Sequence, residues 1–294
     1  MSKLCPRALI TGGRGQLGSE LQATAPAGWQ VASPGSGELD VTQPEVVSAI
    51  VSRERPDVII HAAAYTDVDG AEQKVELAEA VNVAGADNVA NAAAGVGARM
   101  IYISTDFVFD GALGRPYTPA DEARPLGVYG RTKLAGEQAV LARGAGSSLV
   151  VRTAWVYSVH GRNFVRTMLG LMESQTTIAV VSDQIGSPTW AHTLAQALWR
   201  AAERPDLGGI VHWTDAGVAS WYDFAVAIQE EAMASGLLSR AAAILPVRTV
   251  DFPRPARRPS YSVLDKTTGW DALGGPAAHW RLNLRCMLAS VADA

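Results

Sequence analysis

The most constraining feature of the sequence is a glycine-rich turn near its N-terminus. Residues 8–11 are typical of a short buried strand, and residues 16–25 are typical of a helix. Between them, Gly12, Gly15 and Gly18 form the pattern GxxGxxG. The first glycine permits a tight turn, the second lets the backbone approach a pyrophosphate, and the third lets the helix pack closely on the strand. In this context the pattern predicts a dinucleotide site with its phosphates at the helix N-terminus.

The alternation of strand and helix continues through the first half of the chain. The further expected strands cover residues 29–32, 57–60, 100–104 and 149–151. The expected helices are one that begins at Pro44, a long Ala-rich helix over residues 71–94, and one over residues 129–142. Apolar strands separated by helices indicate a parallel sheet covered on both faces. We therefore predict an α/β protein with a Rossmann-type doubly wound parallel sheet.

In the second half of the chain, strands and helices alternate less regularly. We predict that this half forms a smaller C-terminal α/β lobe that binds substrate. Its expected helices cover residues 164–172, 193–202, 221–233 and 280–291, and its expected strands cover residues 178–181 and 210–213. Residues 246–259 are rich in Pro and Arg and are expected to form an ordered loop. We place an NADP-binding domain at residues 1–155 and a mainly substrate-binding lobe at residues 156–294, with some elements returning to the main sheet.

Composition narrows the class of protein. Of the 294 residues, 48% are hydrophobic and 18% are charged, so the chain can bury a core and disorder is excluded. The net charge of −4 and the absence of a basic patch argue against nucleic acid as a partner. Cys5 and Cys286 form no metal or redox spacing, which favours a reducing, cytoplasmic setting. Residues 1–7 hold no apolar signal core, and no run of about 20 apolar residues predicts a membrane span.

The end of the second expected strand bears on the choice of nicotinamide cofactor. NAD-selective sites usually carry an acidic residue there, which holds the ribose 2′-hydroxyl. This strand ends in Val31-Ala32-Ser33-Pro34, without an acid, and the Arg14 guanidinium in the glycine turn could pair with a 2′-phosphate. We predict NADPH as the cofactor, with NADH also accepted. The alternative interpretation of Arg14 is a solvated surface charge.

Other cofactor contacts are expected around the same sheet edge. Asp40 follows the second strand and is expected either to meet the adenine ring or to be a simple turn residue. His61 ends the third strand before three small residues, and we predict that it is packed or hydrogen-bonded without a chemical role. The expected cofactor-binding residues are Gly12, Arg14, Gly15, Gln16, Leu17, Gly18, Ser33, Asp40, Val41, Ala62, Ala63, Ala64, Thr66, Tyr129 and Lys133.

Three residues predict the chemistry. Thr105 ends the fourth strand, and Tyr129 and Lys133 begin the next helix at positions i and i+4, which share one helical face. In this geometry the Lys133 charge can lower the pKa of Tyr129 from about 10, so that the phenol exchanges a proton near neutral pH. Thr105 can donate a hydrogen bond to a carbonyl oxygen held between it and Tyr129. The YxxxK spacing is common and by itself is weak evidence for a catalytic site. Its position after the glycine turn and the Ser-Thr strand end makes the prediction more specific.

At these residues the sequence resembles the extended short-chain dehydrogenase/reductase family, and within it the reductases of nucleotide-linked keto-sugars. The matching segments run from residue 12 to residue 263 and are GGRGQLGSEL, RPDVIIHAAAYTDVDGAE, STDFVFDG, VYGRTKLAGE, RTAWVY, NFVRTML, SDQIGSPT, SWYDFA and PARRPSYS. STDFVFDG and RTAWVY are more specific than the glycine turn, which generic family members share.

The resemblance implies hydride transfer from the nicotinamide to C4 of a nucleotide-linked keto-sugar. Tyr129 would protonate the C4 oxygen, Lys133 would hold the nicotinamide ribose and tune Tyr129, and Thr105 would position and polarise the carbonyl. Trp155 would pack against the sugar ring, where its alternative is core packing. The residues implied to bind substrate are Thr105, Asp106, Tyr129, Trp155, Asn163, Gln184 and Arg257, with Arg257 or Arg258 as a diphosphate clamp.

The chain departs from the family's pattern in two respects. Phe107 stands where the family often has Tyr, so a hydroxyl that could touch the substrate is absent. Some members dimerise through a metal held by glutamates; Glu20 matches one of these, whereas His192 and Ser290 replace two others. We therefore predict no bound metal, and a monomer or weak homodimer.

Two other functions remain open at this point. A nucleotide-sugar epimerase or dehydratase would share the fold but keep NAD tightly bound and return the hydride, and dehydratases tend to carry an acidic pair where this chain has Asp106 and Phe107. A non-catalytic NADP-binding regulator is also known in this reductase group, as a regulatory subunit of methionine adenosyltransferase. The presence of Thr105, Tyr129 and Lys133 argues against the regulator.

Overall fold

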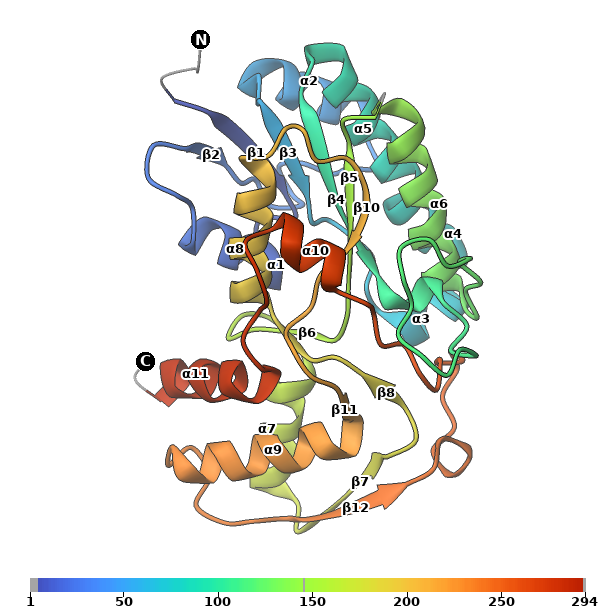
Figure 1. Ribbon diagram of the computed structural model, residues 1–294, viewed down its shortest axis with the longest axis vertical. Coiled ribbons are helices and arrows are strands. Elements are labelled where there is room, and N and C mark those ends of the chain that lie inside the picture. Colours follow the sequence, from blue (N-terminus) through green and yellow to red (C-terminus); the bar gives the residue numbers. More distant parts are fainter. Residues whose placement is uncertain (1–4, 145, 293–294) are drawn as a thin grey trace.

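Six parallel strands form the central sheet of the protein (Figure 1). The computed structural model describes residues 5–144 and 146–292, so the ends of both predicted domains, at residues 1–4 and 293–294, lie outside the described residues. The strands are β1 (Arg7–Thr11), β2 (Gln30–Ala32), β3 (Val58–His61), β4 (Arg99–Thr105), β5 (Leu149–Thr153) and β10 (Gly209–His212). Their order is β10-β5-β4-β3-β1-β2, so the direction of winding reverses between β1 and β3. Ligands of open α/β sheets bind beyond the carboxyl ends of the strands at such a point.

Helices cover both faces of this sheet (Figure 1). On one face lie α1 (Gln16–Ala23) and α8 (Ala191–Ala202), and on the other lie α2 (Pro44–Glu54), α5 (Gly85–Val96) and α6 (Val128–Arg143). Alternate strand residues explain the two layers, because Ile10 and Ile60 pack towards α1 whereas Leu9 and Ile59 pack towards α2 and α5. The prediction of a doubly wound parallel sheet is confirmed.

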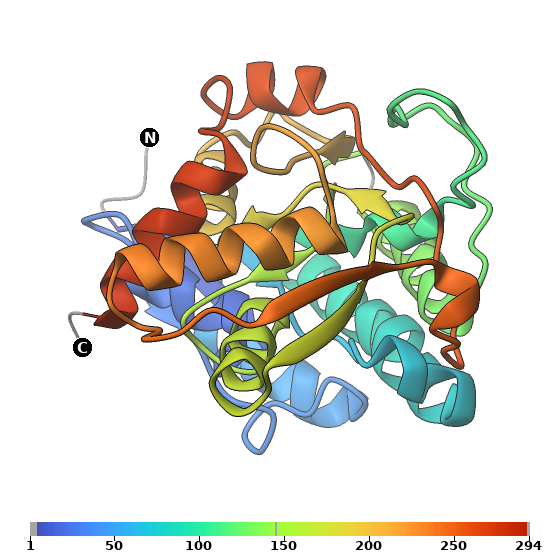
Figure 2. The ribbon, with the colours of Figure 1, turned by 90° about the horizontal axis from the view of Figure 1, so that it is seen from below.

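A smaller lobe lies below the carboxyl ends of the strands. Figure 2 looks onto this lobe and shows α7 and α9 beside the pair β7 and β12. Its elements are β6 (Val156–Tyr157), α7 (Phe164–Ser174), β7 (Thr177–Val181), β8 (Ile185–Gly186), β9 (Thr189–Trp190), β11 (Ala219–Ser220), α9 (Trp221–Ala234), β12 (Ala243–Val247) and α11 (Trp280–Ala292). A second apolar core fills it, with Met168, Phe224 and Leu284 at its centre. Helix α10 (Thr267–Ala272) returns to pack beside β10.

The expected Ala-rich helix over residues 71–94 is only partly right: residues 75–94 are helical throughout, but a break at Lys74 and a π-helical turn divide the expected element. The chain forms α3 (Val68–Gln73), α4 (Val75–Glu79), a π-helical turn η1 (Ala80–Ala84) and then α5. Lys74 breaks the first helix with φ −122° and ψ 53°. The π turn carries the buried Asn82, whose side chain bonds to the Tyr65 backbone and to the Thr132 hydroxyl. The chain therefore stays helical here, and the π turn is the part of the helix that carries these tertiary hydrogen bonds.

The expected loop over residues 246–259 is partly wrong as well. It begins inside β12, and the 3₁₀ turn η3 (Thr249–Asp251) follows. Pro246 argues against a central strand because it has no N–H, but β12 is paired only with β7 in a two-stranded sheet. The other predicted elements form within a few residues of their expected limits. Within residues 5–144 and 146–292, no helix is both long enough and apolar enough to cross a membrane.

Candidate active site

The glycine turn forms a cradle at the carboxyl end of β1. Gly12 has φ 70°, in the left-handed region that favours glycine, and a Cβ there would lie 2.8 Å from the Ala63 nitrogen. A Cβ at Gly18 would collide with the Gly12 carbonyl oxygen and the Gly13 backbone. Gly15 caps α1 without a side-chain bond. The turn therefore presents bare backbone and the N-terminus of α1, which is the environment that a pyrophosphate needs.

Substitution of Gly18 by alanine is expected to weaken NADPH binding by at least about tenfold, because the methyl group collides with backbone that cannot move away cheaply. Fluorescence titration with NADPH measures this change. Gly95→Ala is the matched control, since a Cβ at Gly95 meets nothing within 4 Å. Equal affinity in Gly18→Ala and Gly95→Ala would contradict the close approach of the turn to the cofactor.

The residues expected near the cofactor's adenosine end lie around the same turn. The Arg14 side chain is 81% exposed, pairs with Glu38 at 3.0 Å and crosses Gly35. The Ser33 hydroxyl is buried and has no hydrogen-bond partner among the described residues. Asp40 accepts bonds from the backbone and hydroxyl of Thr42, in the geometry of a turn residue. Val41, by contrast, is buried, and Gln16 and Leu17 lie at the start of α1.

On the other side of the turn, the residues after β3 form the sheet edge. Ala62, Ala63 and Ala64 are half-buried, and Thr66 is exposed at the end of this stretch. The Ala63 nitrogen donates to the Thr11 hydroxyl at 3.2 Å. His61 is buried, bonds to Thr11 at 2.8 Å and stacks on Tyr102, which confirms the prediction of a packed and hydrogen-bonded histidine. Burial, with the nearby Lys133 charge, lowers the pKa of His61 to about 3, so the ring is neutral.

Thr105 and Tyr129 meet at the carboxyl end of β4. Their side chains are neighbours there, and Phe107 packs edge-on against the Tyr129 ring at 5.8 Å between centroids. The neighbouring Asp106 is buried and accepts bonds from the hydroxyls of Thr105 (3.2 Å) and Ser262 (2.5 Å). Burial raises the pKa of Asp106 to about 7, although these hydrogen bonds lower it. A carbonyl oxygen placed beside Thr105 and Tyr129 would find two hydroxyl groups there.

Lys133 lies one turn further along α6, under Tyr129. Its ammonium group is 4.1 Å from the centre of the Tyr102 ring, and burial lowers its pKa to about 7 while Glu137 partly restores it. Burial also raises the pKa of Tyr129 to about 12, and the neighbouring Thr105 hydroxyl only partly opposes this shift. The expected lowering of the Tyr129 pKa by Lys133 is therefore wrong for this structure. Desolvation of the phenolate outweighs the charge of a lysine that is itself easily neutralised.

A cavity of about 840 Å³ opens between the residues after β3 and the smaller lobe. Thr66 and Asp69 line its upper side, and α7, β7 and residues 249–258 line the rest. Of the residues predicted to bind substrate, Asn163, Gln184 and Arg257 line this cavity. Thr105, Asp106, Tyr129 and Trp155 are not among its lining residues.

Trp155 contacts Trp221, a residue that lines this cavity, and has a strained backbone conformation. Its φ of 46° lies in the left-handed region, which costs a non-glycine residue about 1–3 kcal/mol. The indole stacks on Trp221, a lining residue, with 3.5 Å between ring centroids, and it also lies against the bare backbone of Gly186. Strain of this kind persists where surrounding structure fixes it, and it is concentrated at functional sites.

The polar residues of the cavity differ in how free they are. The Asn163 amide caps α7 and bonds to Gln16 in the glycine turn at 2.9 Å. Gln184 donates to Thr249 at 3.0 Å. Arg258 pairs with Asp69, whereas Arg257 is exposed and pairs with no side chain among the described residues, so its guanidinium is open to a ligand. Among residues 5–144 and 146–292, other candidate cations on the wall are Arg162 and Arg254.

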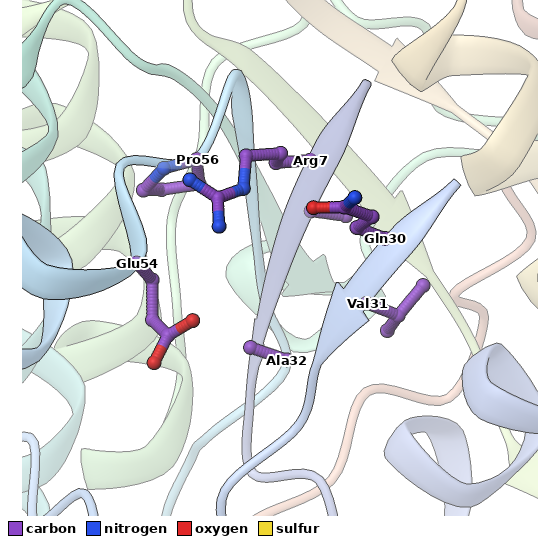
Figure 3. Close-up of a pocket in the computed structure, with 7 residues that line it drawn as sticks. Arg7, Gln30, Val31, Ala32, Glu54 and Pro56 are labelled. Carbon is purple, nitrogen blue, oxygen red and sulfur yellow. The ribbon is translucent and has the colours of Figure 1, made fainter. Parts of the chain in front are cut away.

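A second, much smaller cavity lies on the far side of β1 and β2 (Figure 3). It holds about 110 Å³ and is lined by Arg7, Ala8, Gln30, Val31, Ala32, Glu54 and Pro56. Arg7 and Gln30 are the first residues of their strands, and so this hollow lies away from Thr105 and Tyr129. Its size is that of a few water molecules.

The carboxylate of Glu20 is used within the chain. It is buried, accepts a bond from Ser158 at 2.7 Å and lies 3.1 Å from the His192 ring. Ser290 donates to a carbonyl of its own helix. Across residues 5–144 and 146–292, no group of three or more His, Cys, Asp or Glu side chains is placed to hold a metal.

Several residues of this site were missed by the sequence analysis. Asn82 and Glu137 are buried polar residues on helices, and Arg152 and Ser262 lie on a strand and in a loop. Glu137 and Arg152 form a fully buried ion pair directly below Lys133 on α6. A polar residue on an otherwise apolar helical face, such as Asn82 among alanines, was the one available signal.

Comparisons with known proteins find relatives over nearly the whole chain. The family model of the RmlD substrate binding domain matches residues 6–292. The dTDP-4-dehydrorhamnose reductase of Mycobacterium tuberculosis is 45% identical over 98% of this chain and 94% of its own length. That of Escherichia coli K12 is 39% identical over 95% and 96%.

Solved structures of the same group of reductases are similar to this chain. The dTDP-4-dehydrorhamnose reductase of Bacillus anthracis, in complex with NADP, has a TM-score of 0.91 at 36% identity and covers 97% of this chain and 99% of its own. The Thermus thermophilus UDP-glucose 4-epimerase, at 19% identity and a TM-score of 0.81, shares the fold. The chain therefore belongs to the RmlD family, the family of its dTDP-4-dehydrorhamnose reductase relatives.

Proposed function

We propose that this protein reduces dTDP-4-dehydro-L-rhamnose to dTDP-L-rhamnose with NADPH, as a step of dTDP-rhamnose biosynthesis. The observation that carries the proposal is the pair of neighbouring hydroxyl groups of Thr105 and Tyr129 at the carboxyl end of β4, with Lys133 buried one turn below. Relatives of the same length that carry the name dTDP-4-dehydrorhamnose reductase supply the substrate.

The chain's own residues fit NADPH. Gly12, Gly15 and Gly18 would admit the pyrophosphate to the N-terminus of α1, because side chains at Gly12 and Gly18 would fill that space. The Ser33 hydroxyl, which is buried without a partner among the described residues, and the exposed guanidinium of Arg14 suit a 2′-phosphate. Ala62, Ala63 and Ala64 would leave room for the ribose. NADPH, when bound, supplies the hydride.

The catalytic residues then act on the sugar carbonyl. Tyr129 keeps its proton across the physiological range, because burial raises its pKa to about 12, and it would donate that proton to the C4 oxygen. Thr105 would hold the same oxygen by a hydrogen bond. Lys133 would bind the nicotinamide ribose through its ammonium group, and its ion–ring contact with Tyr102 fixes its direction.

The 840 Å³ cavity has the size of a site for a nucleotide sugar, since ligand pockets hold about 300–1,000 Å³. Arg257 would bind the diphosphate, Gln184 and Asn163 would contact the nucleotide, and Trp155 would pack on the sugar. We further propose that residues 1–155 bind the cofactor and residues 156–294 mainly bind the substrate, with β10 and α8 contributing to the main sheet.

We also propose a cytoplasmic monomer or weak homodimer, without nucleic acid, membrane or a bridging metal as partner. The proposal is supported by the contacts of the Glu20 carboxylate, which bonds to Ser158 and His192 within the chain. Sedimentation velocity with and without a chelator measures it. A tight dimer that dissociates on chelation would contradict it.

The test of the function is NADPH oxidation by the purified protein, with dTDP-4-dehydrorhamnose generated in the same tube. Rapid consumption of NADPH, together with formation of dTDP-rhamnose, would support the reductase. Tight binding of NADPH without consumption would instead favour a regulatory subunit or a different keto-sugar. A protein that purifies with bound NAD and needs no added cofactor would favour an epimerase.

Substitution of Lys133 by methionine is expected to weaken NADPH binding and to lower turnover, each by roughly tenfold or more, because one ammonium group serves the ribose and the charge balance of the site. Steady-state kinetics and a binding titration measure the two effects separately. Lys74→Met, on an exposed residue, is the control. Unchanged affinity for NADPH in Lys133→Met would mean that Lys133 does not bind the ribose.

A further inference from the structure

We propose that the short helix α3 links the wall of the substrate cavity to the catalytic tyrosine, with Asp69 holding the wall and Glu72 holding the start of α6. Glu72 is on this account a positioning residue for Tyr129. The inference rests on the proposed function, because it assigns the cavity to the substrate and Tyr129 to proton transfer.

The first part of the link is an unusual cap on α6. The N-cap residue, Gly127, has no side chain to bond the free N–H groups of the first turn. Glu72, 56 residues earlier in the chain, supplies the missing acceptor: its carboxylate takes the Val128 N–H at 2.7 Å. Tyr129 is the next residue. A negative charge at this place is also favoured by the helix dipole.

Packing reinforces the contact between α3 and the start of α6. Ala71 on α3, Ala78 and Val128 are buried together, and the Tyr65 and Tyr129 rings pack against them. A Cβ at Gly127 would lie 2.6 Å from the Glu72 carboxylate, so the glycine leaves the space that the carboxylate fills. A shift of α3 would therefore move Val128, and with it the neighbouring Tyr129.

The second part of the link is the contact of α3 with the cavity wall. Asp69 accepts two bonds from the Arg258 guanidinium, at 3.0 and 2.9 Å, and a third from the Ala256 nitrogen at 3.2 Å. Asp69, Ala256 and Arg258 all line the cavity, next to Arg257. An anionic ligand that binds the arginines of this wall would therefore act directly on the ion pair between Arg258 and Asp69.

Helix α3 is short and is bounded at both ends, so it can move as a rigid unit. It has six residues, and Asp69 and Glu72 are three apart, so they lie about one turn from each other. Asp67 caps its N-terminus, and the break at Lys74 separates it from α4. The two carboxylates thus belong to one small rigid unit with a hinge behind it.

The link is tested first without any ligand, by hydrogen exchange of the backbone amides over residues 124–132. Glu72→Ala is expected to speed this exchange by roughly 3- to 30-fold, which is the effect of losing a helix cap. Gly127→Ala, which pushes the carboxylate away from Val128, is expected to do the same, and Asp69→Ala is expected to give a smaller increase. Glu76→Ala, an exposed glutamate on α4, is the matched control and is expected to match the wild type. Wild-type exchange in Glu72→Ala or in Asp69→Ala would overturn the link.

Kinetics then test the coupling to Tyr129. Glu72→Ala is expected to lower kcat by roughly 3- to 30-fold with little change in the KM for NADPH, and Glu72→Gln, which keeps an oxygen acceptor, is expected to restore most of it. In the double variant Asp69→Ala/Glu72→Ala, the loss of kcat should be less than the product of the two single losses, because both act through α3. Multiplicative losses would overturn the coupling. If the wild-type protein does not consume NADPH at all, the proposed function fails, while the exchange experiment still decides the link.

Discussion

Tyr129→Phe is expected to lower kcat by roughly 10²–10⁴-fold while leaving the affinity for NADPH unchanged. Phenylalanine keeps the ring that packs against Phe107 and in the apolar cluster with Val128, and it removes only the hydroxyl that meets Thr105. The fold and the cofactor cradle are therefore preserved, and the proton donor is lost. Single-turnover NADPH oxidation and a binding titration measure the two quantities.

The ionisation of Tyr129 is expected to lower kcat only at high pH. Reduction uses the protonated phenol, and the pKa of Tyr129 is about 12, so the phenol loses its proton only at high pH. We expect no fall of kcat from Tyr129 ionisation below about pH 10. Tyr102→Phe is the matched control, because that hydroxyl makes only long bonds to two carbonyls away from Thr105. Equal loss of NADPH binding and turnover in Tyr129→Phe would mean that Tyr129 has a structural role.

The parts of the site that were predictable are those tied to the ends of regular elements. Gly12, Thr105 and Tyr129 come together because a parallel sheet brings the carboxyl ends of its strands to one edge, where the next helices also begin. Sequence order and spacing fix that arrangement. The glycine turn, the strand ends and the YxxxK helix were therefore located correctly.

The parts that were not predictable depend on contacts between distant segments. Asn82 bonds to Thr132, 50 residues away, and Ser262 bonds to Asp106, 156 residues away. No local periodicity reports such pairs, and the π turn at Asn82 follows from them. The sign of the Tyr129 pKa shift was missed for a related reason. The i, i+4 spacing places Lys133 correctly, but the pKa depends on burial by the whole fold.

Glu137→Ala is expected to lower the free energy of unfolding by about 3–5 kcal/mol. Glu137 and Arg152 have side chains that are only 1% and 3% exposed, and two bonds of 2.9 and 2.7 Å join them. Removal of the carboxylate leaves the Arg152 guanidinium buried without an anion, and its Nη1 atom already lacks a hydrogen-bond partner among the described residues. Urea unfolding followed by circular dichroism measures the loss.

Two control variants distinguish the effect of burying a charge from the effect of losing its ion-pair partner. Arg143→Ala breaks the exposed pair with Asp87 at the end of the same helix and is expected to cost less than about 1 kcal/mol. The double variant Glu137→Leu/Arg152→Met removes both charges and is expected to recover much of the stability, since apolar replacement of a buried pair is often neutral. It should not recover the cofactor affinity, because Glu137 also raises the pKa of Lys133 and keeps its ammonium group charged. A double variant with full NADPH affinity would show that the pair stabilises the fold alone, and that Lys133 is held in its charged form by the cofactor.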